Sequence, residues 1–136
     1  TTIAGTNGGN LLVEGIKMSQ SQISIIRFAG RAAYQGDAEL RDQLVLPVAT
    51  EMRHTVEAML LAARERGEIR PDVDLHAAAR VVNTMLISLG DSEIYPYLNN
   101  YLQVSDADMP FDRVLDAAAL LICDGLGYGS AASSKE

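Results

Sequence analysis

Residues 62–79 read AARERGEIRPDVDLHAAA, and this stretch predicts the end of one helix, a tight connection and the start of another. Arg64 would lie in the last helical turn, where a cation interacts favourably with the negative end of the helix dipole. Gly67 can adopt the left-handed conformation that ends a helix, and Pro71 lacks the N–H that a continuing helix needs. Asp74 can accept a hydrogen bond from the first free N–H groups of the next helix.

The composition of the whole chain extends this helical prediction. Its 136 residues are enough for one domain that buries about two-thirds of its unfolded surface. Hydrophobic residues make up 48% but aromatic residues only 5%, and such an alanine-, leucine- and methionine-containing mixture favours helices over strands. No convincing strand pattern, internal repeat or heptad run is present. The sequence therefore predicts an all-α domain of five to six helices that are antiparallel or cross one another.

The ends of the chain differ in composition from its centre. Residues 1–10 are polar and glycine-rich, which predicts a flexible linker, and residues 128–136 predict a disordered tail. Residues 11–127 would form the helical domain. Within it we expect long helices over residues 11–34, 47–66, 75–94 and 111–126, and shorter segments over residues 38–45 and 97–104. Pro47 predicts a kink or a new helix start.

Charge and cysteine content exclude several classes of protein. The net charge is −7, with seven acidic residues and one basic residue between Asp91 and Asp124, which argues against direct binding of nucleic acid by these residues. A solvated acidic face is the main interpretation of this stretch, and cation binding is the alternative. The single cysteine, Cys123, lies in an apolar run too short to cross a membrane. Because no signal peptide is recognisable either, we expect a cytoplasmic protein.

Catalytic and metal-binding motifs are weak or missing in the sequence. It contains no glycine-rich phosphate loop and no G-x-S-x-G turn. Glu51 and His54 have the spacing found in di-iron helical bundles, but such a site needs two pairs of this kind and two further glutamates. We therefore expect no catalytic residue, no metal site and no cofactor. Four methionines, Met18, Met52, Met59 and Met85, could fill the core or line an adaptable apolar pocket, and the sequence leaves both interpretations open.

Three features together resemble the C-terminal ligand-binding and dimerisation domain of TetR-family transcriptional regulators. The first is the segment FAGRAAYQGDAELR at residues 28–41, and the second is the connection RGEIRPDVD at residues 66–74. The third is the pair of late helices over residues 75–94 and 111–126. Family members also carry an N-terminal basic helix-turn-helix, which residues 1–10 do not resemble. The resemblance implies a repressor-like regulator whose DNA-binding domain is absent from this chain.

The resemblance also implies a binding site and an interface. A small, mostly apolar effector would enter a cavity between the first helix and the helices over residues 47–66 and 75–94. Helix faces suggest as its ligand-binding residues Phe28, Arg31, Met52, Thr55, Met59, Asn83 and Leu86. The last two long helices would pair with those of a second copy as a four-helix bundle, which makes a homodimer. The expected interface residues are Val82, Leu89, Val114, Ala118, Leu121 and Ile122. The alternative is a helical homodimerisation module without a ligand.

Overall fold

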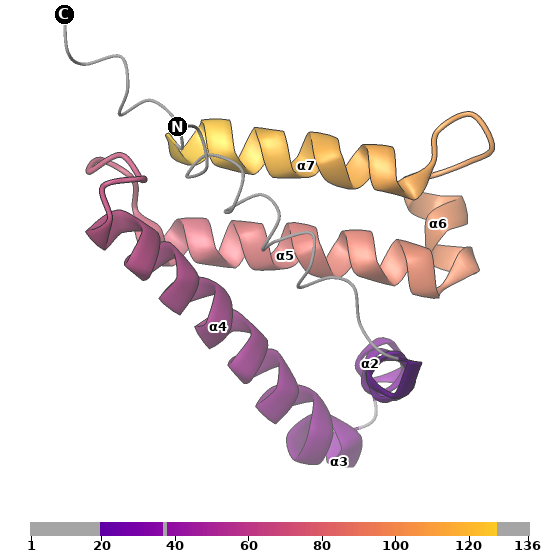
Figure 1. The fold of residues 1–136 in the computed structure, drawn as a ribbon. Coiled ribbons are helices and arrows are strands. Elements are labelled where there is room, and N and C mark those ends of the chain that lie inside the picture. Colours follow the sequence, from indigo (N-terminus) through magenta and orange to yellow (C-terminus); the bar gives the residue numbers. More distant parts are fainter. Residues whose placement is uncertain (1–19, 37, 128–136) are drawn as a thin grey trace, which may run out of the picture.

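The computed structural model describes residues 20–36 and 38–127 of the chain (Figure 1). Every regular element within these ranges is helical and none is a strand, so the predicted all-α class is confirmed. The elements are α2 (Gln20–Gln35), α3 (Ala38–Leu40), the π-helical segment η1 (Arg41–Val45), α4 (Leu46–Glu65), α5 (Leu75–Ile94), α6 (Pro96–Leu102) and α7 (Phe111–Leu126). The predicted linker, the predicted tail and the first turns of the predicted first helix lie outside the described residues. No helix in the described ranges is both long and apolar enough to cross a membrane.

The long helices form an open wedge (Figure 1). Helices α5 and α7 lie side by side and run in opposite directions, with α6 and a loop joining them at one end. Helix α4 diverges from α5, starting from the connection that links the two. Helix α2 lies near the far end of α5, at the wide end of the wedge. Two different environments follow: a narrow end, where α4 and α5 meet, and a wide end, where α2 faces both.

The connection between α4 and α5 forms as its sequence predicts. Gly67 has a φ of 75°, and its N–H donates to the Arg64 carbonyl at 2.9 Å. The next N–H, of Glu68, donates to the Ala63 carbonyl at 3.0 Å, which completes a Schellman motif. Asp74 caps α5 by accepting a hydrogen bond from the N–H of Ala77 at 3.1 Å. Local chemistry therefore determines both helix ends here.

The hydrophobic core occupies the narrow end of the wedge. Its buried members come from α4, the connection, α5 and α7, and they are Leu60, Ala63, Ile69, Leu75, Ala79, Val82, Ile122 and Leu126. The connection is also hydrogen-bonded to the end of α7, where the N–H of Arg70 donates to the Leu126 carbonyl at 3.0 Å. Side chains thus fill the narrow end, whereas the described residues at the wide end surround a cavity.

The chain passes into α4 through a widened turn and not through a break. The Leu46 N–H donates to the Arg41 carbonyl, five residues earlier, which is the hydrogen bond of a π-helix. Pro47 follows immediately and has no N–H to continue the ladder, and its ring needs space near the preceding turn. The π turn accommodates this proline, so α4 begins at Leu46 and continues η1 directly.

Candidate functional site

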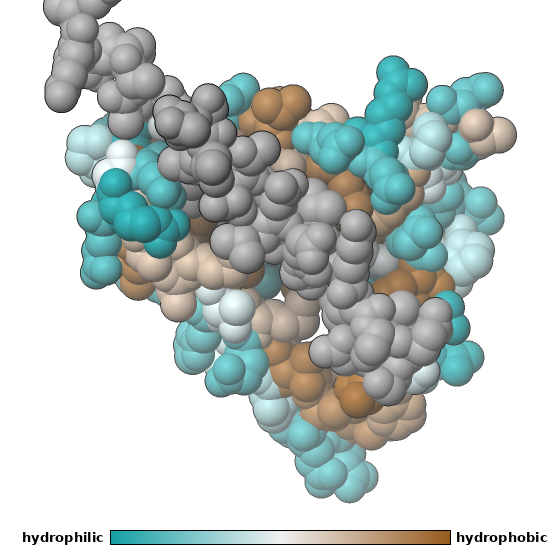
Figure 2. Space-filling view, in the orientation of Figure 1, coloured by the Kyte–Doolittle hydropathy of each residue, from teal (hydrophilic) through white to brown (hydrophobic). Residues whose placement is uncertain are grey.

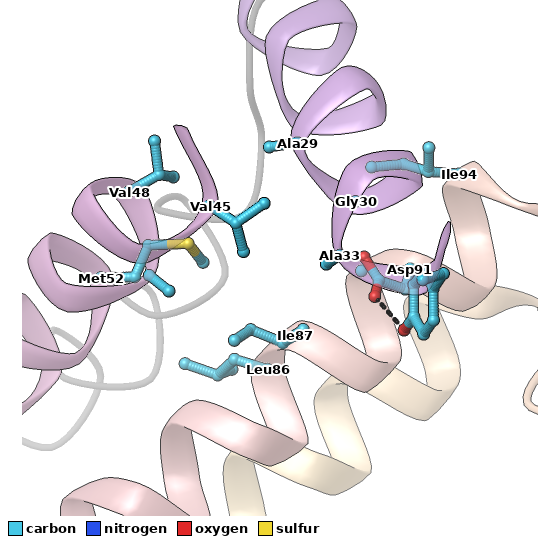
Figure 3. Close-up of a pocket in the computed structure, with 13 residues that line it drawn as sticks. Ala29, Gly30, Ala33, Val45, Val48, Met52, Leu86, Ile87, Asp91 and Ile94 are labelled. Carbon is cyan, nitrogen blue, oxygen red and sulfur yellow. Dashed lines mark hydrogen bonds between the residues drawn. The ribbon is translucent and has the colours of Figure 1, made fainter. Parts of the chain in front are cut away.

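A cavity of about 320 Å³ lies at the wide end of the wedge, between α2, the η1–α4 segment and the second half of α5 (Figure 3). The resemblance to TetR-family regulators implies an effector cavity between these same three helices. The lining residues are Ala29, Gly30, Ala33, Tyr34, Val45, Val48, Ala49, Met52, Leu86, Ile87, Gly90, Asp91 and Ile94. Figure 2 shows hydrophobic surface in the lower part of this face, where α2 and the start of α4 approach each other. The volume is at the lower end of the range for small-molecule sites.

Small residues on α2 make room for the cavity. Three of the lining positions of α2 carry no side chain larger than a methyl group, since they are Ala29, Gly30 and Ala33. On α5 the lining residue Gly90 has no side chain. Larger apolar side chains, among them Met52, form the facing wall on η1 and α4 (Figure 3). Because α4 diverges from α5, these walls do not close against each other as they do in the core.

Asp91 and Tyr34 are the polar side chains of the cavity wall. The Tyr34 hydroxyl donates to Asp91 Oδ2 at 2.7 Å, which links α2 to α5 (Figure 3). The Asp91 residue is only 8% exposed. Burial raises the pKa of the Asp91 carboxyl above its ordinary value of 3.8, and the hydrogen bond from Tyr34 opposes this rise. Burial and the neighbouring Asp91 raise the pKa of the Tyr34 hydroxyl.

Three tyrosines pack against one another beside the cavity and connect α2 with the end of α5. The Tyr34 and Tyr95 rings meet edge to face with centroids 6.4 Å apart, and Tyr97 lies 5.5 Å from Tyr95. The buried Tyr95 hydroxyl donates to the Arg27 carbonyl at 2.6 Å. Gly30 lies against this ring, and only a residue without a side chain leaves the space that Tyr95 occupies. These contacts fix α2 against the end of α5.

The raised pKa of Asp91 predicts a pH-dependent stability difference from the Asp91→Asn variant. Below pH 3.8 the carboxyl is protonated in both states, and burial carries no charge penalty. As the pH rises through the folded-state pKa, the folded protein must ionise a buried group, so the wild type loses free energy of unfolding. The neutral asparagine avoids this loss. Urea unfolding of both proteins between acidic and neutral pH should show that the free energy of unfolding of Asp91→Asn rises relative to that of the wild type as the pH increases. A difference in free energy of unfolding that does not change with pH would contradict the prediction.

The structure places the seven predicted ligand-binding residues in different environments. Met52 and Leu86 line the cavity, whereas Phe28 and Arg31 are exposed on α2. The other three do not line it either: Thr55 and Met59 are exposed on α4, and Asn83 is half-buried on α5. They lie closer to the narrow end, where α4 and α5 approach each other. The cavity is one or two helical turns further towards the wide end.

The six predicted interface residues also divide. Val82, Ala118 and Ile122 are buried within the single chain, and Leu89 and Val114 are half-buried. Leu121 is 70% exposed. Two apolar residues that were not predicted, Val81 beside Val82 and Leu120 beside Leu121, are exposed as well. The outer side of α7 is therefore the part of the predicted interface that a second copy can reach.

Sequence reasoning missed Asp91 as a cavity residue and counted it only as part of an acidic stretch. A usable signal was present, because Ile87, Gly90, Asp91 and Ile94 have the spacing of one helix face. A single acid on an otherwise apolar face is a candidate for a buried charge. Tyr34 gave no such signal, since its partner is 57 residues away in the sequence.

Other polar groups lie apart from the cavity. Among the described residues, no group of three or more His, Cys, Asp and Glu side chains could hold a metal ion. His54 Nε2 lies 3.1 Å from an Arg53 guanidinium nitrogen, and His76 contacts Glu57 through its Nδ1. Burial raises the pKa of the Cys123 thiol, which lowers its reactivity at neutral pH.

Comparisons of the chain with protein family models, with curated proteins and with solved structures found no match. The fold and site define a helical domain with an apolar cavity that contains one buried carboxylate. The resemblance to TetR-family regulators stays a prediction that rests on the sequence motifs.

Proposed function

We propose that this chain is the effector-sensing and dimerisation domain of a TetR-like transcriptional regulator, and that a small, mostly apolar molecule binds in the cavity. The observation that carries the proposal is a space of about 320 Å³ lined by apolar side chains from α2, η1, α4 and α5. A structural domain of this size gains stability by filling such a space. A domain that binds a ligand must keep it open.

The position of the cavity supports a sensing role. A bound molecule would contact α2 on one side and α4 and α5 on the other, and so would favour one arrangement of these helices. In a TetR-like regulator the DNA-binding domain precedes this segment. A ligand that moves α2 would therefore change the spacing between the two DNA-binding domains of the dimer and release DNA. DNA binding would come only from that preceding domain.

The exposed apolar side chains of α5 and α7 support a homodimer. Val81, Leu120 and Leu121 are all more than half exposed in the described part of the chain, and burying their apolar area in an interface would be favourable. A second copy related by a two-fold axis would cover them with the same helices, and a stable interface would bury about 1,600 Å² in total. This feature alone equally supports the second candidate, a homodimerisation module without a ligand.

Thermal unfolding with octan-1-ol separates these two candidates. At ten times its dissociation constant a ligand adds about 1.4 kcal/mol, which raises the Tm of a domain of this size by about 3–5 °C. The Gly90→Leu variant should lose this rise, because the new side chain fills cavity space that is open at present. Gly125→Leu on α7 is the matched control, since its surroundings are also open and it does not line the cavity.

Two outcomes would count against ligand sensing. Equal Tm shifts in the wild type and in Gly90→Leu would show that octan-1-ol binds elsewhere. No shift in the wild type, together with a concentration-dependent dimer in sedimentation experiments, would favour the homodimerisation module.

A further inference from the structure

The two ends of the cavity wall differ in charge. Among the described residues that line it, Asp91 is the one acid and none is basic. Figure 3 places Asp91 at the α2–α5 edge, whereas Val48 and Met52 form the opposite wall. A molecule that spans the cavity would therefore meet a carboxylate at one end and hydrocarbon at the other.

The hydrogen bonding of Asp91 leaves acceptor capacity for a ligand. A carboxylate offers about four lone-pair sites on its two oxygens, and Tyr34 donates to Oδ2. A buried charge is costly unless it is paired and hydrogen-bonded. One hydroxyl satisfies this requirement only in part, since it brings no opposite charge.

We propose that the molecule bound in the cavity is a lipophilic cation, with an ammonium or similar N–H-bearing group paired with Asp91 and a hydrocarbon body against α4 and α5. This inference rests on the proposed function and names the chemical class of its ligand. No cation among the described residues pairs with this carboxylate, and the ligand would give it a charge-assisted hydrogen bond, which is about twice as strong as a neutral one.

The charges around the site agree with this choice. The chain has a net charge of −7, so its field attracts cations and repels anions. Arg27 and Arg31 lie on α2 close enough to act electrostatically on Tyr95, but both are exposed to solvent. A neutral ligand would fill the same space and leave Asp91 without a counter-charge. An anionic ligand would add a second negative charge beside it.

Three molecules that share one tail test the inference by calorimetry at pH 7: octylammonium, octan-1-ol and octanoate. We expect the wild type to bind octylammonium about tenfold more tightly than octan-1-ol, and octanoate most weakly. In Asp91→Asn the advantage of octylammonium should disappear, while the affinity for octan-1-ol stays within about twofold. Glu93→Gln is the matched control, because it removes the same charge from an exposed position of α5.

The outcomes distinguish the ligand class from the existence of a ligand site. Equal or tighter binding of octan-1-ol or octanoate by the wild type would overturn the cation inference and leave the sensing function standing. An advantage of octylammonium that persists in Asp91→Asn would overturn the role of Asp91. If none of the three binds, both proposals fail. If Asp91→Asn does not fold, the relative affinities of the wild type for octylammonium, octan-1-ol and octanoate still test the cation inference.

Discussion

Replacing Ile122 by alanine is expected to lower the free energy of unfolding by about 2–5 kcal/mol, because the truncation leaves a cavity in the core. Ile122 is 7% exposed and is one of two α7 residues in the buried core at the narrow end of the wedge, where it joins α7 to α4 and α5. Domains of this kind have a total stability of about 5–15 kcal/mol. The loss would therefore be a large fraction of the whole.

Leu121→Ala provides the matched control in chemical denaturation. Leu121 is the preceding residue on α7 and is 70% exposed, so the same kind of truncation should change the unfolding of the isolated chain by less than about 0.5 kcal/mol. If the outer side of α7 forms the dimer interface, Leu121→Ala should instead raise the dimer dissociation constant. An Ile122→Ala effect no larger than that of Leu121→Ala at low protein concentration would contradict the assignment of Ile122 to the core.

Replacing Gly30 by alanine is expected to destabilise the protein by about 1–3 kcal/mol, although alanine is the better helix former. A Cβ on Gly30 would lie 2.5 Å from the Tyr95 hydroxyl oxygen and 3.2 Å from two ring carbons. The ring must move, and it then loses its hydrogen bond to the Arg27 carbonyl. Because these contacts hold α2 against α5, the variant should also bind ligands in the cavity less tightly.

A double-mutant cycle with Tyr95→Phe tests this explanation by urea unfolding. The phenylalanine ring lacks the atom at 2.5 Å, so Gly30→Ala should cost less in the Tyr95→Phe background than in the wild type. Gly125→Ala serves as the control, because its Cβ would meet no other atom and alanine stabilises a helix. A full-sized cost of Gly30→Ala in the Tyr95→Phe background would show that crowding at the hydroxyl is not the cause.

Helix boundaries were the most predictable feature of this chain. Helices α5 and α7 begin and end at the residues expected, and α4 differs by one residue at each end. The signals for these ends are a capping aspartate, prolines and glycines, which act over one helical turn and do not depend on distant residues. The π turn before α4 was not predicted, because a widened turn and a break can both accommodate Pro47.

The candidate site was predictable only in outline. The resemblance implied a cavity between the first helix and the helices over residues 47–66 and 75–94, and the structure has a cavity there that Met52 and Leu86 line. The sequence did not indicate how far along those helices the cavity lies, because the angle at which α4 leaves α5 depends on packing across the whole core. For the same reason the sequence did not indicate that Thr55, Met59 and Asn83 lie towards the narrow end, outside the cavity lining.

The sequence by itself determined the helical class, most helix ends and the capped connection between α4 and α5, since these follow from periodicity and from local hydrogen bonds. The tertiary structure decided that Val82, Ala118 and Ile122 are buried within one chain, and that Asp91 meets Tyr34 at the wall of an apolar cavity. These outcomes depend on contacts between residues far apart in the chain. A helical periodicity shows which residues share a face, but only packing shows whether that face meets the core, a cavity or solvent.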